Sequence, residues 1–147
     1  KRALIVVDVQ SEFDPLNLGR RNNPVSEENI ASLLCAWRKA GQPVVFVRHD
    51  SVTLQSPLRP YQPGNTFKAI ITGEPDLLVV KSVNSSFHGI PDLAEWLHRS
   101  DIRAITICGI TTNHCCEMTA RVQANLGFDT WFVLDATHTF DRADLDG

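Results

Sequence analysis

The chain contains five short apolar runs, separated by segments with helical or loop character. A run of four to six apolar residues that stops abruptly is typical of a strand buried on both faces of a parallel sheet. Strands that alternate with amphipathic helices form βαβ units, in which helices cover both faces of the sheet. The sequence therefore predicts a three-layer, Rossmann-like α/β fold with a mostly parallel sheet. The five runs are residues 3–7, 44–47, 77–80, 104–108 and 129–134.

Three segments between the runs favour helices. Residues 26–40 have an apolar face of helical spacing and begin with Ser26, a residue type that caps helix N-termini. A short helix is expected after Pro91, and a third helix over residues 114–126. By contrast, residues 49–75 contain four prolines and no long periodicity. Loops of this length inside a compact domain are usually functional, so we expect this one to cover the site.

Length and composition favour one enzyme-sized domain over residues 1–147. The 147 residues are 43% hydrophobic and 21% charged, and the net charge of −3 comes without a basic cluster, which argues against nucleic acid or membrane partners. No apolar run approaches the roughly 20 residues that a membrane span needs. The four cysteines lie on expected helices and strands, so a reduced, cytoplasmic setting is predicted. The chain opens without Met and ends soon after the fifth run, so we expect its ends, the C-terminus above all, to be truncated.

Three reactive side chains lie where strands end. Asp8 and Lys81 terminate the first and third apolar runs, and Cys115 follows the fourth run at the start of the third helix. The carboxyl ends of parallel strands share one edge of the sheet, so an acid, an ammonium and a thiol should converge there. The unpaired amides of a helix start lower a nearby thiol pKa and can hold an oxyanion. The alternative is that Asp8 and Lys81 reach solvent or pair with each other, and that Cys115 is a small buried hydrophobe.

Three separated motifs surround these residues. Together they resemble the isochorismatase-like cysteine hydrolase superfamily, which includes nicotinamidases, carbamoylsarcosine-type amidohydrolases and isochorismatases. The resemblance covers residues 1–140, with the motifs in the expected order. The motifs are Asp8-Val9-Gln10 with Phe13, then Lys81 followed by Ser85-Ser86-Phe87 and Gly89, and finally Gly109-Ile110-Thr111-Thr112-Asn113-His114-Cys115.

The resemblance implies a chemistry. Asp8 would be the general base, Lys81 would lower the pKa of Cys115 and orient Asp8, and Cys115 would form a thioester. The amides of Thr111 and Cys115 would hold the oxyanion, with a cis peptide bond between Ile110 and Thr111. The expected substrate is a small amide, carbamoyl compound or lactam, and the protein is expected to be a homo-oligomer, a dimer or a tetramer. Two alternatives remain: vinyl ether hydrolysis, against which Cys115 argues, and a binding protein without turnover.

Candidate pocket residues lie near the same strand ends. Nicotinamidases carry an Asp-x-His pattern and further histidines after the second strand, where they bind a metal. This chain has Arg48-His49-Asp50-Ser51 there and no further histidine before His88, so we predict no metal and no other cofactor. Cys116 should face the sheet, because successive helical residues point about 100° apart. The candidate pocket residues are Phe13, His49, Tyr61, Asn84, Phe87 and His114.

Overall fold

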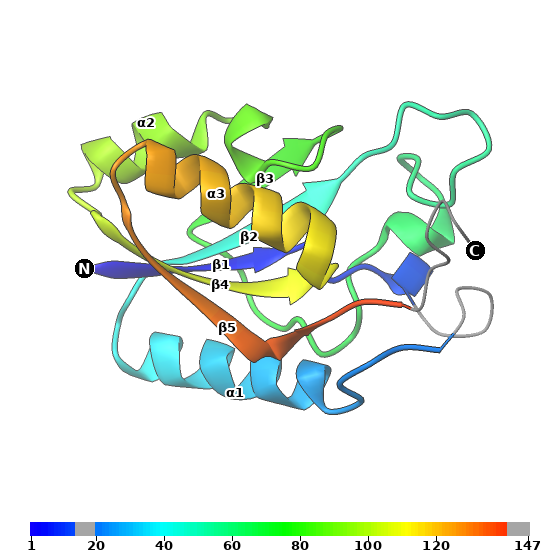
Figure 1. Cartoon of the computed structure of the whole chain (residues 1–147), viewed down its shortest axis with the longest axis horizontal. Coiled ribbons are helices and arrows are strands. Elements are labelled where there is room, and N and C mark those ends of the chain that lie inside the picture. Colours follow the sequence, from blue (N-terminus) through cyan, green and yellow to red (C-terminus); the bar gives the residue numbers. More distant parts are fainter. Residues whose placement is uncertain (14–19, 141–147) are drawn as a thin grey trace, which may run out of the picture.

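The computed structural model describes residues 1–13 and 20–140, which form a five-stranded sheet between helices. All neighbouring strands are parallel and follow the order β3-β2-β1-β4-β5, so the predicted α/β fold is confirmed. Helices lie on both sides of the sheet (Figure 1). The strands are β1 (Arg2–Val7), β2 (Val44–His49), β3 (Leu77–Lys81), β4 (Ala104–Ile110) and β5 (Asp129–His138).

The central strand β1 shows why the apolar runs form the sheet. Its side chains alternate between two buried clusters: Ile5 and Val7 pack on one face and Leu4 and Val6 on the other. Every second residue points to the opposite face of a strand, so a continuous apolar run is what a strand covered on both faces requires.

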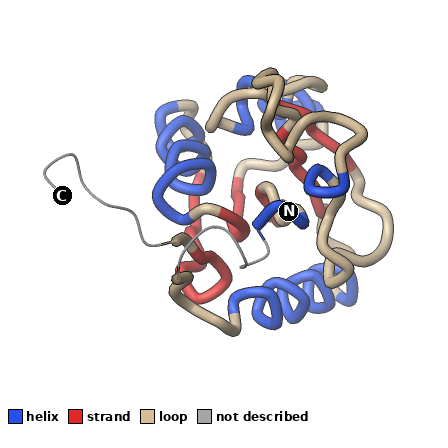
Figure 2. The backbone as a smooth tube through the Cα atoms, turned by 90° about the vertical axis from the view of Figure 1, so that its right-hand side faces the viewer, coloured by secondary structure: helices blue, strands red, loops and turns tan. Residues whose placement is uncertain are grey.

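The helices divide between these two faces. Helix α1 (Ser26–Lys39) packs on one of them, and α2 (Leu93–Arg99) and α3 (Glu117–Asn125) pack on the other. Figure 2 views the molecule from the right-hand side of Figure 1 and shows helices on both sides of the strands. Ile30 and Leu34 anchor α1, while Leu93 and Leu97 anchor α2, as their spacing predicts.

Two helix starts differ from the prediction. Ser26 is not an N-cap: Val25 occupies that position, and the Ser26 hydroxyl lies 2.7 Å from His138 Nδ1 instead. The helix expected over residues 114–126 begins as a π-helical turn, Thr112–Cys116, and continues as α3. The tertiary contact that attracts the Ser26 side chain is not visible in local sequence.

Gly109 permits the close contact between β4 and β1. Its φ is +135°, and a Cβ atom at this position would lie 2.1 Å from the Val7 carbonyl oxygen. Only glycine fits such a position. The tight pairing aligns the ends of the two strands that carry Asp8 and the turn leading to Cys115.

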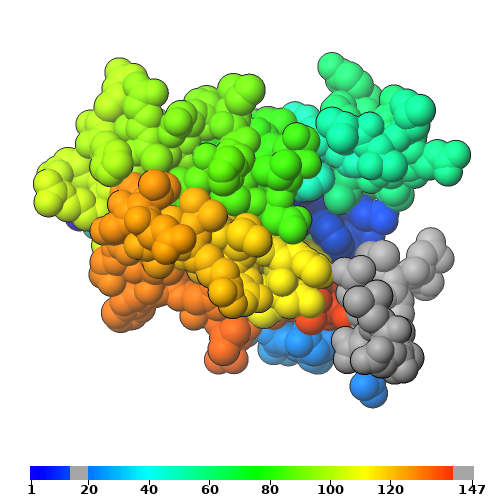
Figure 3. Space-filling view, turned by 45° about the horizontal axis from the view of Figure 1, so that its top comes forward, coloured from blue at the N-terminus to red at the C-terminus, as the bar shows by residue number. Residues whose placement is uncertain are grey.

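The segment between β2 and β3 is a long loop with one short helical turn, η2 (Pro63–Asn65). Two further short turns, η1 (Ser11–Phe13) and η3 (Ser86–His88), follow β1 and β3. The loop, teal in the space-filling view, stands beside the blue segment that follows β1 (Figure 3). None of the helices within residues 1–13 and 20–140 has the length and apolar character of a membrane span.

Candidate active site

The three predicted residues meet beyond the carboxyl ends of β1, β3 and β4. Lys81 Nζ lies 2.8 Å from Asp8 Oδ2 and 3.6 Å from Cys115 Sγ. Asp8 is fully buried, and the exposed fractions of Lys81 and Cys115 are 2% and 9%. Asp8 has a positive φ of 51° and follows β1 directly, and its amide donates a hydrogen bond to the Val47 carbonyl of β2. The neighbouring strands therefore fix the carboxylate beneath the site.

The Lys81 ammonium has a third partner, His49. Its Nζ lies 3.2 Å from His49 Nδ1, so one nitrogen contacts a carboxylate, an imidazole and a thiol. An ammonium has three N–H donors and no acceptor. The three contacts account for all of its donors and hold the charge in one place.

The Asp8 carboxylate has one oxygen available for proton transfer. Oδ2 accepts from Lys81, whereas Oδ1 is buried and has no hydrogen-bond partner among the described residues. A buried acceptor without a partner is costly, and in enzymes such groups often have a catalytic use. Oδ1 is therefore the carboxylate oxygen that still has its full acceptor capacity.

Burial raises the pKa of the Cys115 thiol to about 12, and the Asp8 carboxylate raises it further, against the opposing effect of Lys81. Lys81 lowers this pKa, as expected, but the expectation that the pKa as a whole falls below its usual value is wrong. Desolvation disfavours the thiolate more than the ammonium stabilises it. The resting side chain is a neutral thiol, which makes a nearby base necessary for attack.

The turn after β4 contains the two residues whose amides are predicted to hold an oxyanion, Thr111 and Cys115. The Ile110–Thr111 peptide bond is cis, as the resemblance implied. Thr111 and Cys115 both border the same cavity as Asp8. Cys116 is fully buried in the core beneath α3, so it faces the sheet as predicted.

A cavity of about 600 Å³ opens above these groups. Four of the predicted pocket residues line it: Phe13, His49, Asn84 and His114. Tyr61 and Phe87 lie outside it. Tyr61 is fully exposed on the long loop, and Phe87 packs against Phe128 with ring centroids 6.0 Å apart.

Three lining residues, Leu58, Thr139 and Phe140, were not predicted from the sequence. Leu58 comes from the long loop, and the other two directly follow β5. Phe140 stacks with Phe13, with centroids 6.4 Å apart. Thr139 and Phe140 could have been predicted as cavity residues from their position at the carboxyl end of a strand. The sequence analysis ended the fifth run at residue 134, however, whereas β5 extends to His138.

The isochorismatase domain model matches residues 2–146. The chain belongs to the isochorismatase family. It is 41% identical over 145 residues to the isochorismatase family protein YrdC of Bacillus subtilis, covering 98% of this chain and 77% of that protein. Nicotinamidase 3 of Arabidopsis thaliana is 31% identical over 155 residues, covering 95% of this chain and 74% of the relative.

Solved structures of the family have the same fold. An isochorismatase-family protein from Chromobacterium violaceum superposes with a TM-score of 0.93 at 36% identity, covering all of this chain and 76% of the other. N-carbamoylsarcosine amidase from Thermoplasma acidophilum has a TM-score of 0.83 at 21% identity, over 99% of this chain and 87% of the other, which supports the fold alone.

A metal, as in nicotinamidases, does not fit the residues of this site. The ligand-type atoms of Asp8, His49 and Cys115 lie within 4.8 Å of one another. Lys81 Nζ, however, already lies within contact distance of all three, so a divalent ion there would stand beside a buried ammonium. Asp50 does not add a ligand, because its carboxylate binds Arg48 and Asn65 instead.

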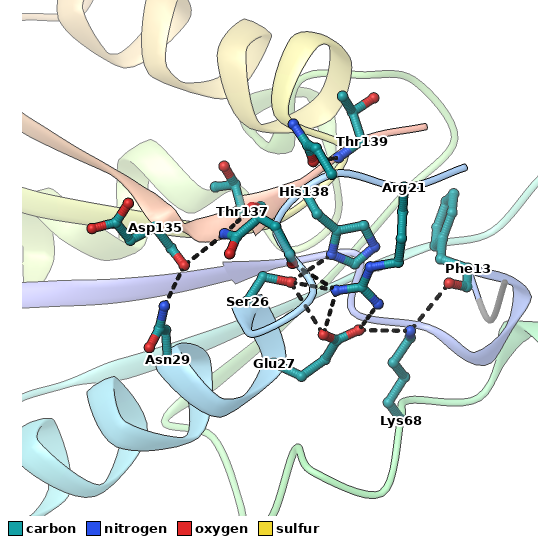
Figure 4. A network of polar contacts seen from close by, with 12 residues as sticks. Phe13, Arg21, Ser26, Glu27, Asn29, Lys68, Asp135, Thr137, His138 and Thr139 are labelled. Carbon is teal, nitrogen blue, oxygen red and sulfur yellow. Dashed lines mark hydrogen bonds and ion pairs between the residues drawn. The ribbon is translucent and has the colours of Figure 1, made fainter. Parts of the chain in front are cut away.

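A second polar cluster contacts two of the aromatic residues that line the cavity. Glu27, in the first turn of α1, accepts two hydrogen bonds of 2.6 Å from Arg21 and one of 3.1 Å from Lys68. Figure 4 shows these cations and Ser26 turned toward the carboxylate. Lys68 also donates to the Phe13 carbonyl at 3.1 Å. The cluster therefore connects α1 to one aromatic wall of the cavity.

The same cluster reaches the other aromatic wall through His138. Ser26 joins His138 to the Arg21 and Glu27 pair, and the His138 ring stands edge-on to Phe140 at 5.5 Å. Burial lowers the pKa of His138 to about 4, with a further contribution from Arg21. This imidazole is therefore neutral at pH 7.

Proposed function

We propose that this isochorismatase-family protein is a cysteine hydrolase that cleaves a C–N bond of a small amide, carbamoyl compound or lactam through a thioester. The observation that carries the proposal is the buried ammonium of Lys81, which lies 2.8 Å from Asp8 Oδ2 and 3.6 Å from Cys115 Sγ. The nicotinamidase at 31% identity is by its name an amidase, which supports an amide substrate.

Acylation begins with proton transfer from the Cys115 thiol to Asp8 Oδ1. Sγ then forms a bond to the carbonyl carbon, while the developing charge on sulfur is stabilised by Lys81. The amides of Thr111 and Cys115 donate to the oxyanion. When the C–N bond breaks, Asp8 gives the proton to the leaving nitrogen, which departs as a neutral amine or ammonia.

Deacylation uses the same base. Asp8 accepts a proton from water, and the hydroxide oxygen attacks the thioester carbon. The C–S bond breaks, the acid or carbamate product leaves, and Asp8 returns the proton to sulfur. The thiol and the carboxylate are both restored, so the cycle consumes one water and no cofactor.

Two alternatives are less well supported. Vinyl ether hydrolysis does not require a nucleophilic thiol. The placement of Cys115 beside a buried acid and ammonium would then have no role in the reaction. A binding protein without turnover would have no reason to retain Oδ1 of Asp8 as a buried acceptor without a partner among the described residues.

The proposal is tested with a panel of small amides, ureas and lactams, assayed on the wild type, Cys115→Ala and Cys116→Ala. We expect turnover that Cys115→Ala abolishes and that Cys116→Ala largely retains, since Cys116 is buried in the core away from the cavity. Cys115→Ser should be nearly inactive, because an alkoxide forms far less readily than a thiolate.

A covalent intermediate trapped for mass spectrometry must map to Cys115. An adduct found only on Cys116, Cys108 or Cys35 would refute the assigned nucleophile.

A further inference from the structure

The contact between Lys81 and His49 determines which ring nitrogen of the histidine carries the proton. Lys81 Nζ lies 3.2 Å from His49 Nδ1, and an ammonium can only donate. Nδ1 must therefore present its lone pair, which leaves the proton of the neutral ring on Nε2. Burial, together with the Lys81 charge, also lowers the pKa of His49, so the doubly protonated ring is disfavoured.

The backbone of His49 is held from two sides. The fully buried Gln10 side chain accepts from the His49 amide at 2.9 Å and donates to its carbonyl at 3.0 Å. Asn65 Nδ2 donates to the same carbonyl at 3.1 Å. Because the backbone and Nδ1 are both fixed, the ring has one orientation.

His49 also borders the cavity. It is half-buried and is one of the lining residues, whereas Lys81 is buried and is not among them. Among the described residues, the hydrogen bonds of His49 involve its amide, its carbonyl and Nδ1, and none involves Nε2. We propose that His49 is a specificity-determining residue whose fixed Nε2–H donates a hydrogen bond to an acceptor atom on the substrate, outside the scissile amide.

This assignment rests on the proposed function and narrows its substrate class. A fixed donor favours amides that carry a second acceptor, such as a ring nitrogen or another carbonyl oxygen, and disfavours a donor group at that position. It also argues against His49 as a general base, since the Nδ1 lone pair is occupied by Lys81 and Nε2 already carries a proton. The base remains Asp8.

The tautomer can be measured without any substrate. Protein labelled with ¹⁵N-histidine is examined by long-range ¹⁵N–¹H NMR at pH 7, with the signals assigned by His49→Asn and with exposed His88→Asn as the control variant. We expect His49 to be the Nε2–H tautomer and Lys81→Met to shift it toward a mixture. An Nδ1–H tautomer in the wild type would overturn the proposal, whether or not the protein hydrolyses amides.

The specificity is tested with two matched pairs whose members differ by one acceptor: nicotinamide against benzamide, and acetoacetamide against butyramide. We compare kcat/KM within each pair, or binding to Cys115→Ala if turnover is absent. His49→Asn can keep an acceptor near Lys81 but lacks the distal donor, and it should reduce the preference for the acceptor-bearing member by about three- to tenfold, as for one hydrogen bond. His49→Gln, which places an amide N–H near the Nε2 position, should restore part of it.

Two results of the paired assay would contradict the assignment. One is that His49→Asn weakens both members of a pair equally, which would indicate a general structural role. The other is that the wild type, or Cys115→Ala where binding is measured, shows no preference within either pair. A protein that shows the predicted tautomer and binding preference but no turnover would support the role of His49 and refute the proposed hydrolysis.

Discussion

At the scale of single residues, the strand-end pattern was sufficient to predict which side chains meet. Asp8, Lys81 and Cys115 each end or follow an apolar run, and topology alone brings such positions together. The protonation of the thiol was not predictable, because desolvation and the approach of Asp8 are properties of the packed site. The contact of His49 with Lys81 was likewise hidden, since it depends on a side-chain direction at the end of β2.

The first prediction at this scale is that Asp8→Asn affects hydrolysis and alkylation in opposite directions. The Asp8 carboxylate raises the pKa of Cys115, so its removal lowers this pKa and increases the thiolate fraction. We expect iodoacetamide to modify Cys115 about threefold faster or more at pH 9, while hydrolysis falls by about 100- to 10,000-fold with loss of the base. Mass spectrometry and a steady-state assay measure the two rates. Equal losses in both would contradict the role of Asp8 as the base.

A second prediction concerns chelators. The position between Asp8, His49 and Cys115 is taken by the Lys81 ammonium, so the reaction should not depend on a divalent ion. We expect activity to survive prolonged EDTA treatment and to show no stimulation by zinc or iron. Loss of activity on chelation, followed by recovery with either metal, would show that a metal displaces the ammonium.

At the scale of elements, periodicity located the strands and the three α-helices. It did not reveal how the segments after β1 and β5 are attached to α1. Ser26 illustrates the difference. Its residue type is a good N-cap, yet its hydroxyl joins Arg21 and His138, which lie 5 and 112 residues away. Long-range partners of this kind override a local preference, so the sequence could not reveal them. The extension of β5 to His138 was missed because its last residues are polar.

The third prediction tests the attachment of α1. Hydrogen bonds from Arg21 and Lys68 hold the pKa of Glu27 well below its usual value, against the effect of burial. A depressed carboxyl pKa stabilises the fold above the unfolded-state pKa, and this stabilisation is lost as the pH falls below it. Glu27→Gln should therefore lower the free energy of unfolding by about 2 kcal/mol at pH 7.

Urea denaturation at pH 7 and at successively lower pH measures this effect. The difference between the wild type and Glu27→Gln should diminish once the pH falls below the model-compound value of 4.5. Glu28→Gln provides the matched control, because Glu28 occupies the same helical turn and does not share these partners. A pH-independent difference would mean that Glu27 acts through packing rather than through its charge.

At the scale of the whole molecule, both faces of one sheet are buried, and the same strands contribute to both clusters. Ile5 and Leu4 of β1 are neighbours in sequence but belong to opposite layers. The alternation of strands and helices predicted this arrangement, because a parallel sheet needs cover on both faces. The single-domain organisation of the protein, its association into oligomers and its location in the cytoplasm stay predictions.

The fourth prediction is that the two layers unfold together. Trp37 on α1 packs on one cluster and Trp96 on α2 on the other, so each reports on one face of the sheet. Single-tryptophan variants, with the other tryptophans replaced by Phe, should give coincident urea transitions that also match the loss of far-UV circular dichroism. Two separated transitions would show that one layer can come apart while the other persists.

The floor and the walls of the cavity come from different kinds of segment. The reacting groups are fixed in buried positions at the ends of β1, β3 and β4, whereas Leu58, Phe13 and Phe140 come from the connections and from the residue run after β5. Mutation of a wall residue leaves the packing of the strands intact, while mutation of the floor disturbs the core. Substitutions in these connections can therefore change which ligand the cavity accepts, while the buried groups at the strand ends stay in place.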